Sequence, residues 1–215
     1  MTGSDGPGRI GKIREDPVDP RRLSPRERYR LLTSLIVPRP IGWISTRSGS
    51  GVPNLAPYSF FNAISASPPL VAVSINQRRG ELKDTLRNIR ETGAFCVNVV
   101  STELLEAMNE SSAEVSPEVD EFALSGLNPV GCDEVDAVRV QESPASLECT
   151  LFREVELGEA PSTLIIGEVK VIHLASRLRV DPESWAVDPT SLNPVGRLGG
   201  DGYTLLGRIR TLPRP

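Results

Sequence analysis

The sequence predicts a mainly β protein whose strands close into a barrel with a few flanking helices. Two observations lead to this prediction. At least six apolar or β-branched runs of strand length occur in the 215 residues, and few helical patterns lie between them. Short turns rich in Gly, Pro and Ser join the first of these runs, as in an antiparallel meander. A closed barrel accommodates many half-apolar strands without leaving sheet edges exposed.

The first 25 residues are rich in glycine, proline and charge and have no periodic apolar face. We therefore expect residues 1–25 to form a flexible tail and residues 26–215 to form one domain. Ser24 and Pro25 are typical of a helix start, which predicts a short helix from Arg26 to Leu35.

Strands are predicted where β-branched or half-apolar runs stand between turn signals. The expected strands are Ile41 to Thr46, Asn54 to Ala63, Leu70 to Ile75, Ala94 to Val100, Ser146 to Leu157 and Leu164 to Leu174. Two further helices are expected, one around Leu82, Leu86 and Ile89 and one from Thr102, as its cap, to Ser111. Residues 112–143 read as an acidic loop with a short turn near Phe122, and residues 181–215 carry no clear pattern.

Composition excludes several classes of function. The formal charge is -4, from 24 Lys plus Arg against 28 Asp plus Glu, so no global positive field attracts nucleic acid or an anionic membrane. No run has the length of a membrane span, and Met1 to Arg14 lacks the apolar stretch of a signal peptide. Cys96, Cys132 and Cys149 are widely spaced, which suits reduced thiols. We expect a cytoplasmic protein without nucleic-acid or membrane partners.

The sequence indicates neither a metal site nor a catalytic side chain. One histidine and three scattered cysteines do not form a zinc motif of neighbouring residues, and no serine stands in a Gly-x-Ser-x-Gly turn. His173 lies in a predicted strand, where packing or hydrogen bonding within the barrel is the expected role. The carboxylates of Asp16, Asp19, Asp120, Asp133 and Asp136 are expected to be solvated. We assign no metal ligand, general acid or general base.

One segment suits a phosphate group. Residues 78–85 run from two arginines through Lys83, Asp84 and Thr85 into the second helix. A helix start with free amides, a lysine ammonium and a threonine hydroxyl together favour an anion. The alternative is an ordinary charged helix start in which Asp84 or Thr85 is the cap, and from this segment alone the alternative is preferred.

A second segment, Asn54 to Asn62, mixes amide, hydroxyl and aromatic groups in a predicted strand. A planar heterocycle requires such a mixture, because its edge needs polar partners and its face needs an apolar one. The alternative is an aromatic-rich strand with a turn. Ser45 and Thr46 end the preceding strand with two hydroxyls. These hydroxyls are expected either to contact the phosphate or ring of a ligand or to form an ordinary polar strand end.

The order of these segments closely resembles the flavin reductase-like FMN-binding split-barrel family. The resemblance extends from about Tyr29 to Tyr203. It rests on these segments: Pro38 to Thr46, Asn54 to Asn62, Pro68 to Leu70, Lys83 to Thr85 with Asn88 and Ile89, Phe95 to Ser101, Ser146 to Cys149, Ile166 to Val169, and Gly196 to Gly200.

The resemblance implies a Greek-key-like split barrel that forms a homodimer and binds FMN near the subunit interface. The residues implied to line the flavin ring and ribityl chain are Ser45, Thr46, Ala56, Pro57, Tyr58, Ser59 and Asn62. The residues implied to hold the phosphate are Arg78, Lys83 and Thr85, with Asp84 orienting the loop. The chemistry implied is redox transfer by the flavin, for which the protein supplies position and polarity.

One departure from the family concerns the electron donor. Many short flavin reductases carry a Gly-Asp-His segment between the last long strands, whereas this chain has residues 158–163, Gly-Glu-Ala-Pro-Ser-Thr. The leading hypothesis is a flavin reductase that passes electrons from NAD(P)H to flavin, to a redox partner or to a monooxygenase component. The missing histidine also favours two alternatives: an FMN-holding electron carrier without a nicotinamide site, and a non-catalytic flavin-binding module.

Overall fold

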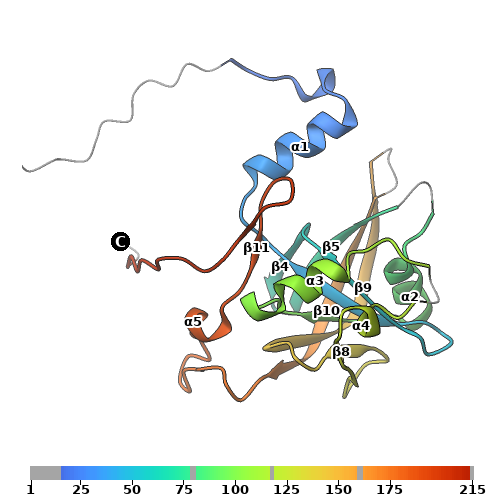
Figure 1. The fold of residues 1–215 in the computed structure, drawn as a ribbon, viewed down its shortest axis with the longest axis vertical. Helices are drawn as coiled ribbons and strands as arrows, with labels where there is room; N and C mark the ends of the chain where they lie inside the picture. Colours follow the sequence, from blue (N-terminus) through green and yellow to red (C-terminus); the bar gives the residue numbers. More distant parts are fainter. Residues whose placement is uncertain (1–15, 78–80, 117–118, 159–161, 214–215) are drawn as a thin grey trace, which may run out of the picture.

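The computed structural model describes residues 16–77, 81–116, 119–158 and 162–213. Its centre is a seven-stranded sheet in which every neighbouring pair is antiparallel (Figure 1). The strands in sheet order are β3 (Pro53–Tyr58), β2 (Gly42–Arg47), β6 (Ala94–Asn98), β9 (Ala145–Leu157), β10 (Ser162–Leu174), β5 (Pro69–Asn76) and β4 (Phe61–Ala66). The prediction of a mainly β fold is confirmed.

The sheet order explains why the sheet curls into a barrel. β3 and β4 stand at opposite ends of the order, yet only Ser59 and Phe60 separate them in the chain. The sheet must therefore bend until its two end strands approach each other. Within the sheet, β3 pairs only with β2 and β4 only with β5, so the barrel is split between them. The single strand expected from Asn54 to Ala63 was wrong, because the chain turns at Ser59 and Phe60.

Two hydrophobic clusters lie on opposite faces of β2. Ile44 belongs to the cluster that also contains Val73, Phe95 and Ile165, whereas its neighbour Trp43 belongs to the other. Both side chains are fully buried, so β2 has no solvent face. In the first cluster Phe95 lies against Gly167, where an added Cβ would stand 2.3 Å from the ring. Only glycine leaves the space that this ring occupies.

Three helices complete the barrel wall around the two clusters. α2 (Asp84–Thr92) places Leu86 and Ile89 in the first cluster and ends at Gly93, whose φ of 68° suits glycine. α3 (Leu105–Glu110) and α4 (Glu121–Leu124) cover Trp43 with Met108 and Phe122. The helix expected from Thr102 begins as a 3-10 turn, η2 (Thr102–Leu104), and its N-cap residue is Ser101 rather than Thr102.

Some short elements fall where the sequence predicted a loop or no structure. β7 (Pro129–Gly131) and β8 (Val138–Val140) form a hairpin in the predicted acidic loop. The remaining short elements in order are η1 (Pro20–Arg22), β1 (Arg39–Pro40), α5 (Pro189–Leu192), β11 (Gly196–Arg197) and β12 (Tyr203–Thr204). β1, β11 and β12 form a small separate sheet.

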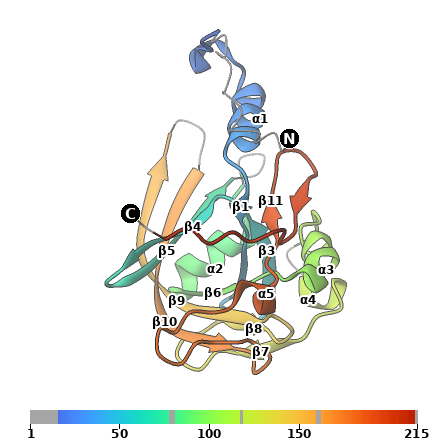
Figure 2. The same cartoon turned by 90° about the vertical axis from the view of Figure 1, so that its left-hand side faces the viewer.

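The helix α1 (Pro25–Leu35) stands away from the barrel (Figure 2). Ser24 and Glu27 form a reciprocal capping box at its start, which agrees with the predicted helix start. Arg39 attaches its C-terminal end, because its guanidinium donates to the carbonyl oxygens of Thr33 and Ile36 and to that of Leu198. Among the described residues, no helix is long and apolar enough to cross a membrane.

Candidate functional site

A cavity of about 540 Å³ lies between β3, the start of α2 and the segment that joins α3 to α4. This volume is in the range of small-molecule sites. The lining residues of one wall, from β3, α2 and the three residues before α2, are Asn54, Ala56, Pro57, Tyr58, Glu81, Leu82, Lys83, Asp84, Thr85 and Arg87. Those of the other wall are Ser111, Ser112, Ala113, Glu114, Val115 and Glu121. One wall thus combines a strand with a helix N-terminus, and the other is formed by the segment between α3 and α4 together with Glu121.

The N-terminus of α2 faces this cavity without a side-chain cap. Lys83 is the N-cap residue and makes no side-chain cap hydrogen bond to the part of the chain that the structure describes. Its ammonium lies 5.0 Å from the ring centroid of Tyr58. Asp84 accepts a hydrogen bond from Arg87 and does not cap the helix. The expectation that Asp84 or Thr85 is the cap was therefore wrong, and Lys83, Asp84 and Thr85 at this helix start line the cavity.

A buried chain of hydrogen bonds forms the floor of the cavity. The Tyr58 hydroxyl donates to Thr85 Oγ1 over 3.0 Å, and Thr85 Oγ1 donates to Asn54 Oδ1 over 2.9 Å. Asn54 Nδ2 then donates to Glu121 Oε1 over 3.0 Å. Burial raises the pKa of Tyr58 well above its usual value, so its hydroxyl stays protonated. The single proton of the Thr85 hydroxyl is committed to Asn54.

Glu121 is the acidic end of this chain and lines the cavity as well. Its Oε2 accepts the amide of Leu55 over 3.2 Å. Burial raises the pKa of Glu121, although hydrogen bonds from the backbone and from Asn54 oppose the shift, and the nearby charge of Asp84 adds to it. A carboxylate with a raised pKa thus lies close to the uncapped helix start.

Six of the residues predicted for flavin binding line the cavity: Ala56, Pro57, Tyr58, Lys83, Asp84 and Thr85. Thr46 lies behind the lining, where it accepts from Asn88 Nδ2 over 3.0 Å and bonds Asn54. Ser59, which faces Arg39, and the exposed Asn62 lie outside this cavity. Arg78 lies outside the described residues. Glu121 was missed, and Asn54 was noted only as the first residue of the segment suited to a heterocycle, because their contact spans 67 residues of the chain.

Ser45 on β2 does not line the cavity. Its hydroxyl is fully buried, donates to the carbonyl oxygen of Val138 over 2.5 Å and accepts from Asn98 Nδ2 over 2.8 Å. The hydrogen bond to Val138 connects β2 to the β7–β8 hairpin. The contact between Ser45 and a flavin stays a prediction.

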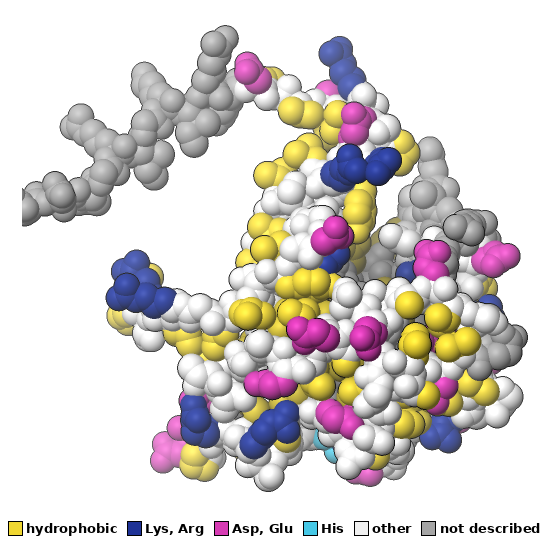
Figure 3. Space-filling view, viewed as in Figure 1, with side chains coloured by type: hydrophobic (Ala, Val, Ile, Leu, Met, Phe, Trp, Pro, Cys, Tyr) yellow, Lys and Arg dark blue, Asp and Glu magenta, His cyan; other side chains and the backbone are white. Residues whose placement is uncertain are grey.

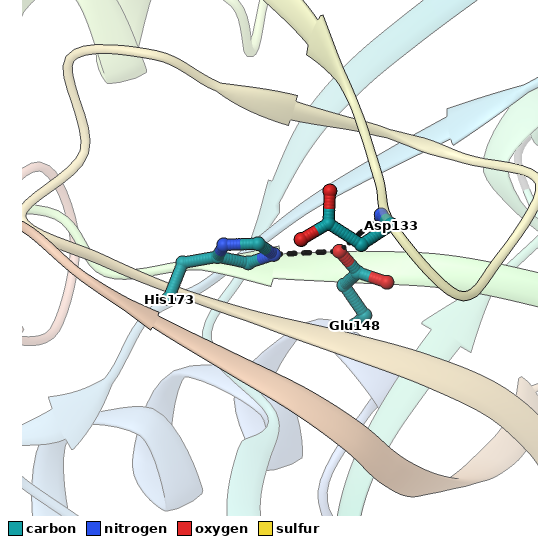
Figure 4. Close-up of side chains that lie close together, drawn as sticks. All are labelled: Asp133, Glu148 and His173. Carbon is teal, nitrogen blue, oxygen red and sulfur yellow. Dashed lines mark hydrogen bonds and ion pairs between the residues drawn. The ribbon is translucent and has the colours of Figure 1, made fainter.

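His173 lies on β10 in a separate cluster with Glu148 and Asp133 (Figure 4). Its Nε2 is 2.6 Å from Glu148 Oε1, which confirms that the histidine is hydrogen-bonded within the barrel. His173 does not line the cavity. The sequence did not reveal this cluster, since its members are 15 and 25 residues apart in the chain. Asp120, expected to be solvated, instead caps α4 by accepting from the amides of Phe122 and Ala123.

The chain is similar to proteins of known sequence and structure over most of its length. A model of the flavin reductase-like domain matches residues 34–186. The uncharacterized protein YwrF of Bacillus subtilis is 36% identical over 198 residues, which are 90% of this chain and 96% of that protein.

Two solved structures share the fold. Nitrilotriacetate monooxygenase component B from Bacillus cereus superposes with a TM-score of 0.88 at 34% identity, covering 94% of this chain and 100% of that one. A putative flavin reductase with a split-barrel domain from Shewanella frigidimarina gives a TM-score of 0.80 at 25% identity, covering 91% and 96%. The chain therefore belongs to the flavin reductase-like family and is a flavin-dependent oxidoreductase built on a split barrel.

Proposed function

We propose that the protein binds FMN in the cavity beside α2 and passes electrons from NAD(P)H to flavin or to a partner protein. The observation that carries this proposal is the uncapped N-terminus of α2 with Lys83 on the cavity wall. Helix amides and an ammonium group bind a phosphate, whereas Tyr58, Ala56 and Pro57 offer an apolar surface to a ring. FMN has both a phosphate and a flat ring, and when bound it would supply the redox chemistry.

The hydrogen bonds at the floor define which atoms can hold the phosphate. Because the Thr85 hydroxyl already donates to Asn54, its proton is not available to a ligand oxygen. The proposed contacts are therefore the backbone amides of Asp84 and Thr85 and the ammonium of Lys83. The negative groups nearby are held by partners, Asp84 by Arg87 and Glu121 by Asn54 and Leu55.

The proposed assembly is a homodimer. α1 and its C-cap residue Ile36 carry large apolar side chains that are exposed in the single chain, with Leu35 at 70%, Ile36 at 60% and Tyr29 at 54%. Figure 3 shows hydrophobic atoms along this projecting segment. Exposed apolar patches of this kind mark protein interfaces, and a second copy of the chain is the partner we propose. If FMN lies near the interface, dilution to monomers should release the flavin, and light scattering with flavin fluorescence measures both events.

The proposed electron acceptors are a monooxygenase and a redox protein. A relative called a monooxygenase component supports a monooxygenase as one acceptor, with a redox protein as the other class. The described cysteines Cys96, Cys132 and Cys149 are free thiols, which suits the cytoplasm as the proposed location. An electron carrier without a nicotinamide site is the second candidate, because the sequence at residues 158–163 lacks the Gly-Asp-His segment that many short flavin reductases carry.

Two measurements test the proposed function. FMN and riboflavin are titrated by calorimetry into the wild type, Lys83→Ala and Lys170→Ala. Lys170 pairs with Glu168 on β10 and does not line the cavity, so it is the matched control. Lys83→Ala should lower the affinity for FMN by about 10- to 100-fold, since a charged hydrogen bond contributes about 1.5–3 kcal/mol. The affinity for riboflavin should be unchanged. Equal affinities of the wild type for FMN and riboflavin would reject the phosphate site.

Anaerobic addition of NADH or NADPH to the FMN-loaded protein then separates the candidates. Bleaching of the flavin absorption within seconds supports a reductase. Persistent absorption, with FMN bound, supports the electron carrier or the non-catalytic flavin-binding module. A protein that cannot be loaded with FMN contradicts all three.

A further inference from the structure

Three metal-ligating side chains from separate segments converge at one place on the barrel. Asp133 lies in the loop after β7, Glu148 on β9 and His173 on β10 (Figure 4). One ligand atom of each lies within 4.8 Å of the other two. From this geometry we infer that Asp133, Glu148 and His173 bind a divalent transition-metal ion, a site separate from the cavity beside α2.

The two strand residues are aligned by the sheet register. In the β9–β10 ladder His173 pairs with Ser146, and Glu148 is two residues further along β9, on the same face. Side chains in this diagonal arrangement across antiparallel strands are within reach of each other. The strands thus hold the imidazole and one carboxylate in place before any ion binds.

The loop is held over Glu148 by its own backbone. The amides of Asp133 and Glu134 donate to Glu148 Oε1 and Oε2 over 2.7 and 2.8 Å. Each carboxylate oxygen has two lone pairs, so each oxygen keeps one that these amides do not use. These two hydrogen bonds also hold the Asp133 side chain near Glu148 and His173.

The charges of the cluster favour a cation. Glu148 is fully buried, and its carboxylate accepts the amides of Asp133 and Glu134 and contacts the His173 imidazole. Among the ion pairs between described residues, neither Glu148 nor Asp133 has a Lys or Arg partner. Two carboxylates beside one imidazole leave negative charge that a divalent ion would balance.

The ligand set selects the class of ion. One imidazole nitrogen with two carboxylate oxygens suits Zn²⁺ and its neighbours, whereas Ca²⁺ and Mg²⁺ prefer oxygen ligands alone. Zinc bonds of about 2.0–2.2 Å place ligand atoms roughly 3.3 Å apart. His173 Nε2 and Glu148 Oε1 are now 2.6 Å apart, so this distance must lengthen when the ion replaces the proton of their hydrogen bond. His173 has room to move, since 20% of its side chain is exposed, and water would complete the coordination.

The test uses the full chain without an affinity tag, stripped with a chelator, and zinc chloride as the probe. We expect one Zn²⁺ per chain by calorimetry and elemental analysis, with a dissociation constant in the micromolar range or below. Because the chain has one histidine, its imidazole NMR signals are unambiguous, and they should shift with the same stoichiometry.

The variants are Asp133→Asn and His173→Gln, with Asp136→Asn as the matched control. Asp133 is exposed and Glu148 is held by its backbone, so Asp133→Asn should fold normally; Asp136 lies in the same loop outside the cluster. Asp133→Asn and His173→Gln should each lower the affinity for zinc at least tenfold, whereas Asp136→Asn should leave it unchanged. Binding only at millimolar zinc, equal binding by all variants, or imidazole signals that do not move would overturn the inference and leave a hydrogen-bonded cluster only.

Discussion

Thr85 donates its hydroxyl proton to the side-chain oxygen of Asn54 across 2.9 Å while it accepts the hydroxyl of Tyr58. Thr85→Val should therefore lower the free energy of unfolding by about 1–3 kcal/mol, because both partners stay buried without this bond. FMN affinity of the folded protein should change only a few-fold. Urea unfolding and FMN titration measure the two effects, and Thr85→Ser is the control. A stable variant with more than tenfold weaker FMN binding would place the hydroxyl on the phosphate.

If FMN binds in the cavity as proposed, Glu121 should make its affinity depend on pH. A bound phosphate adds negative charge beside Glu121 and Asp84, which raises the pKa of Glu121 above its already raised value in the free protein. A proton is then taken up on binding, so FMN affinity should fall as the pH rises through the raised pKa. Lys83 and Arg87 on the same wall reduce this effect. Calorimetry in buffers of different ionisation enthalpy measures the proton uptake.

The control for this effect is Glu121→Gln, which should show less proton uptake and bind FMN more tightly above neutral pH. The phosphate itself also titrates, but equally in both proteins, so the difference in proton uptake between the wild type and the variant measures the part that is due to Glu121. Proton uptake that is the same in the variant would show that Glu121 is not involved.

His173 should not take part in flavin reduction. It binds Glu148 and does not line the cavity, and hydride transfer depends on stacking of the two rings more than on a proton-transferring side chain. His173→Gln should keep any rate of anaerobic flavin bleaching by NAD(P)H within a few-fold in stopped-flow measurements. A loss of two orders of magnitude, with FMN bound and the fold intact, would make His173 catalytic.

Gly167 determines how the first core cluster packs. An added Cβ would stand 2.3 Å from Phe95 Cζ and 3.1 Å from the Cβ of Cys149, so Gly167→Ala must displace a buried ring. We expect a loss of about 1–3 kcal/mol in the free energy of unfolding. Gly131→Ala, where an added Cβ meets nothing within 4 Å, is the control, and similar losses in both variants would reject the packing argument.

The sequence was most informative where the relevant residues are neighbours in the chain. Lys83, Asp84 and Thr85 are consecutive, so a helix start that suits an anion was visible directly, and the structure places all three on the cavity wall. The turn at Ser59 and Phe60 was missed, because neither residue is a glycine or proline that would announce a break in a strand.

Contacts between distant residues were not predictable in this way. The hydroxyl of Ser45 was interpreted as a ligand contact. Because β2 is buried on both faces, its sequence has no alternation of apolar and polar residues that would show which face a hydroxyl lies on. Asn54 and Glu121 meet only after β3 and α4 have packed together, and the same holds for Glu148 and His173 across β9 and β10. Local pattern predicts none of these pairs.

The amide of Leu55 lies on the side of β3 where no further strand pairs, and Glu121 accepts its hydrogen bond. An end strand with open amides is a template on which another chain can add, which leads to aggregation. Here a side chain from α4 occupies this position and blocks the start of such a ladder. The same carboxylate that lines the cavity therefore also hinders strands of other chains from pairing with β3 at the place where the barrel is split.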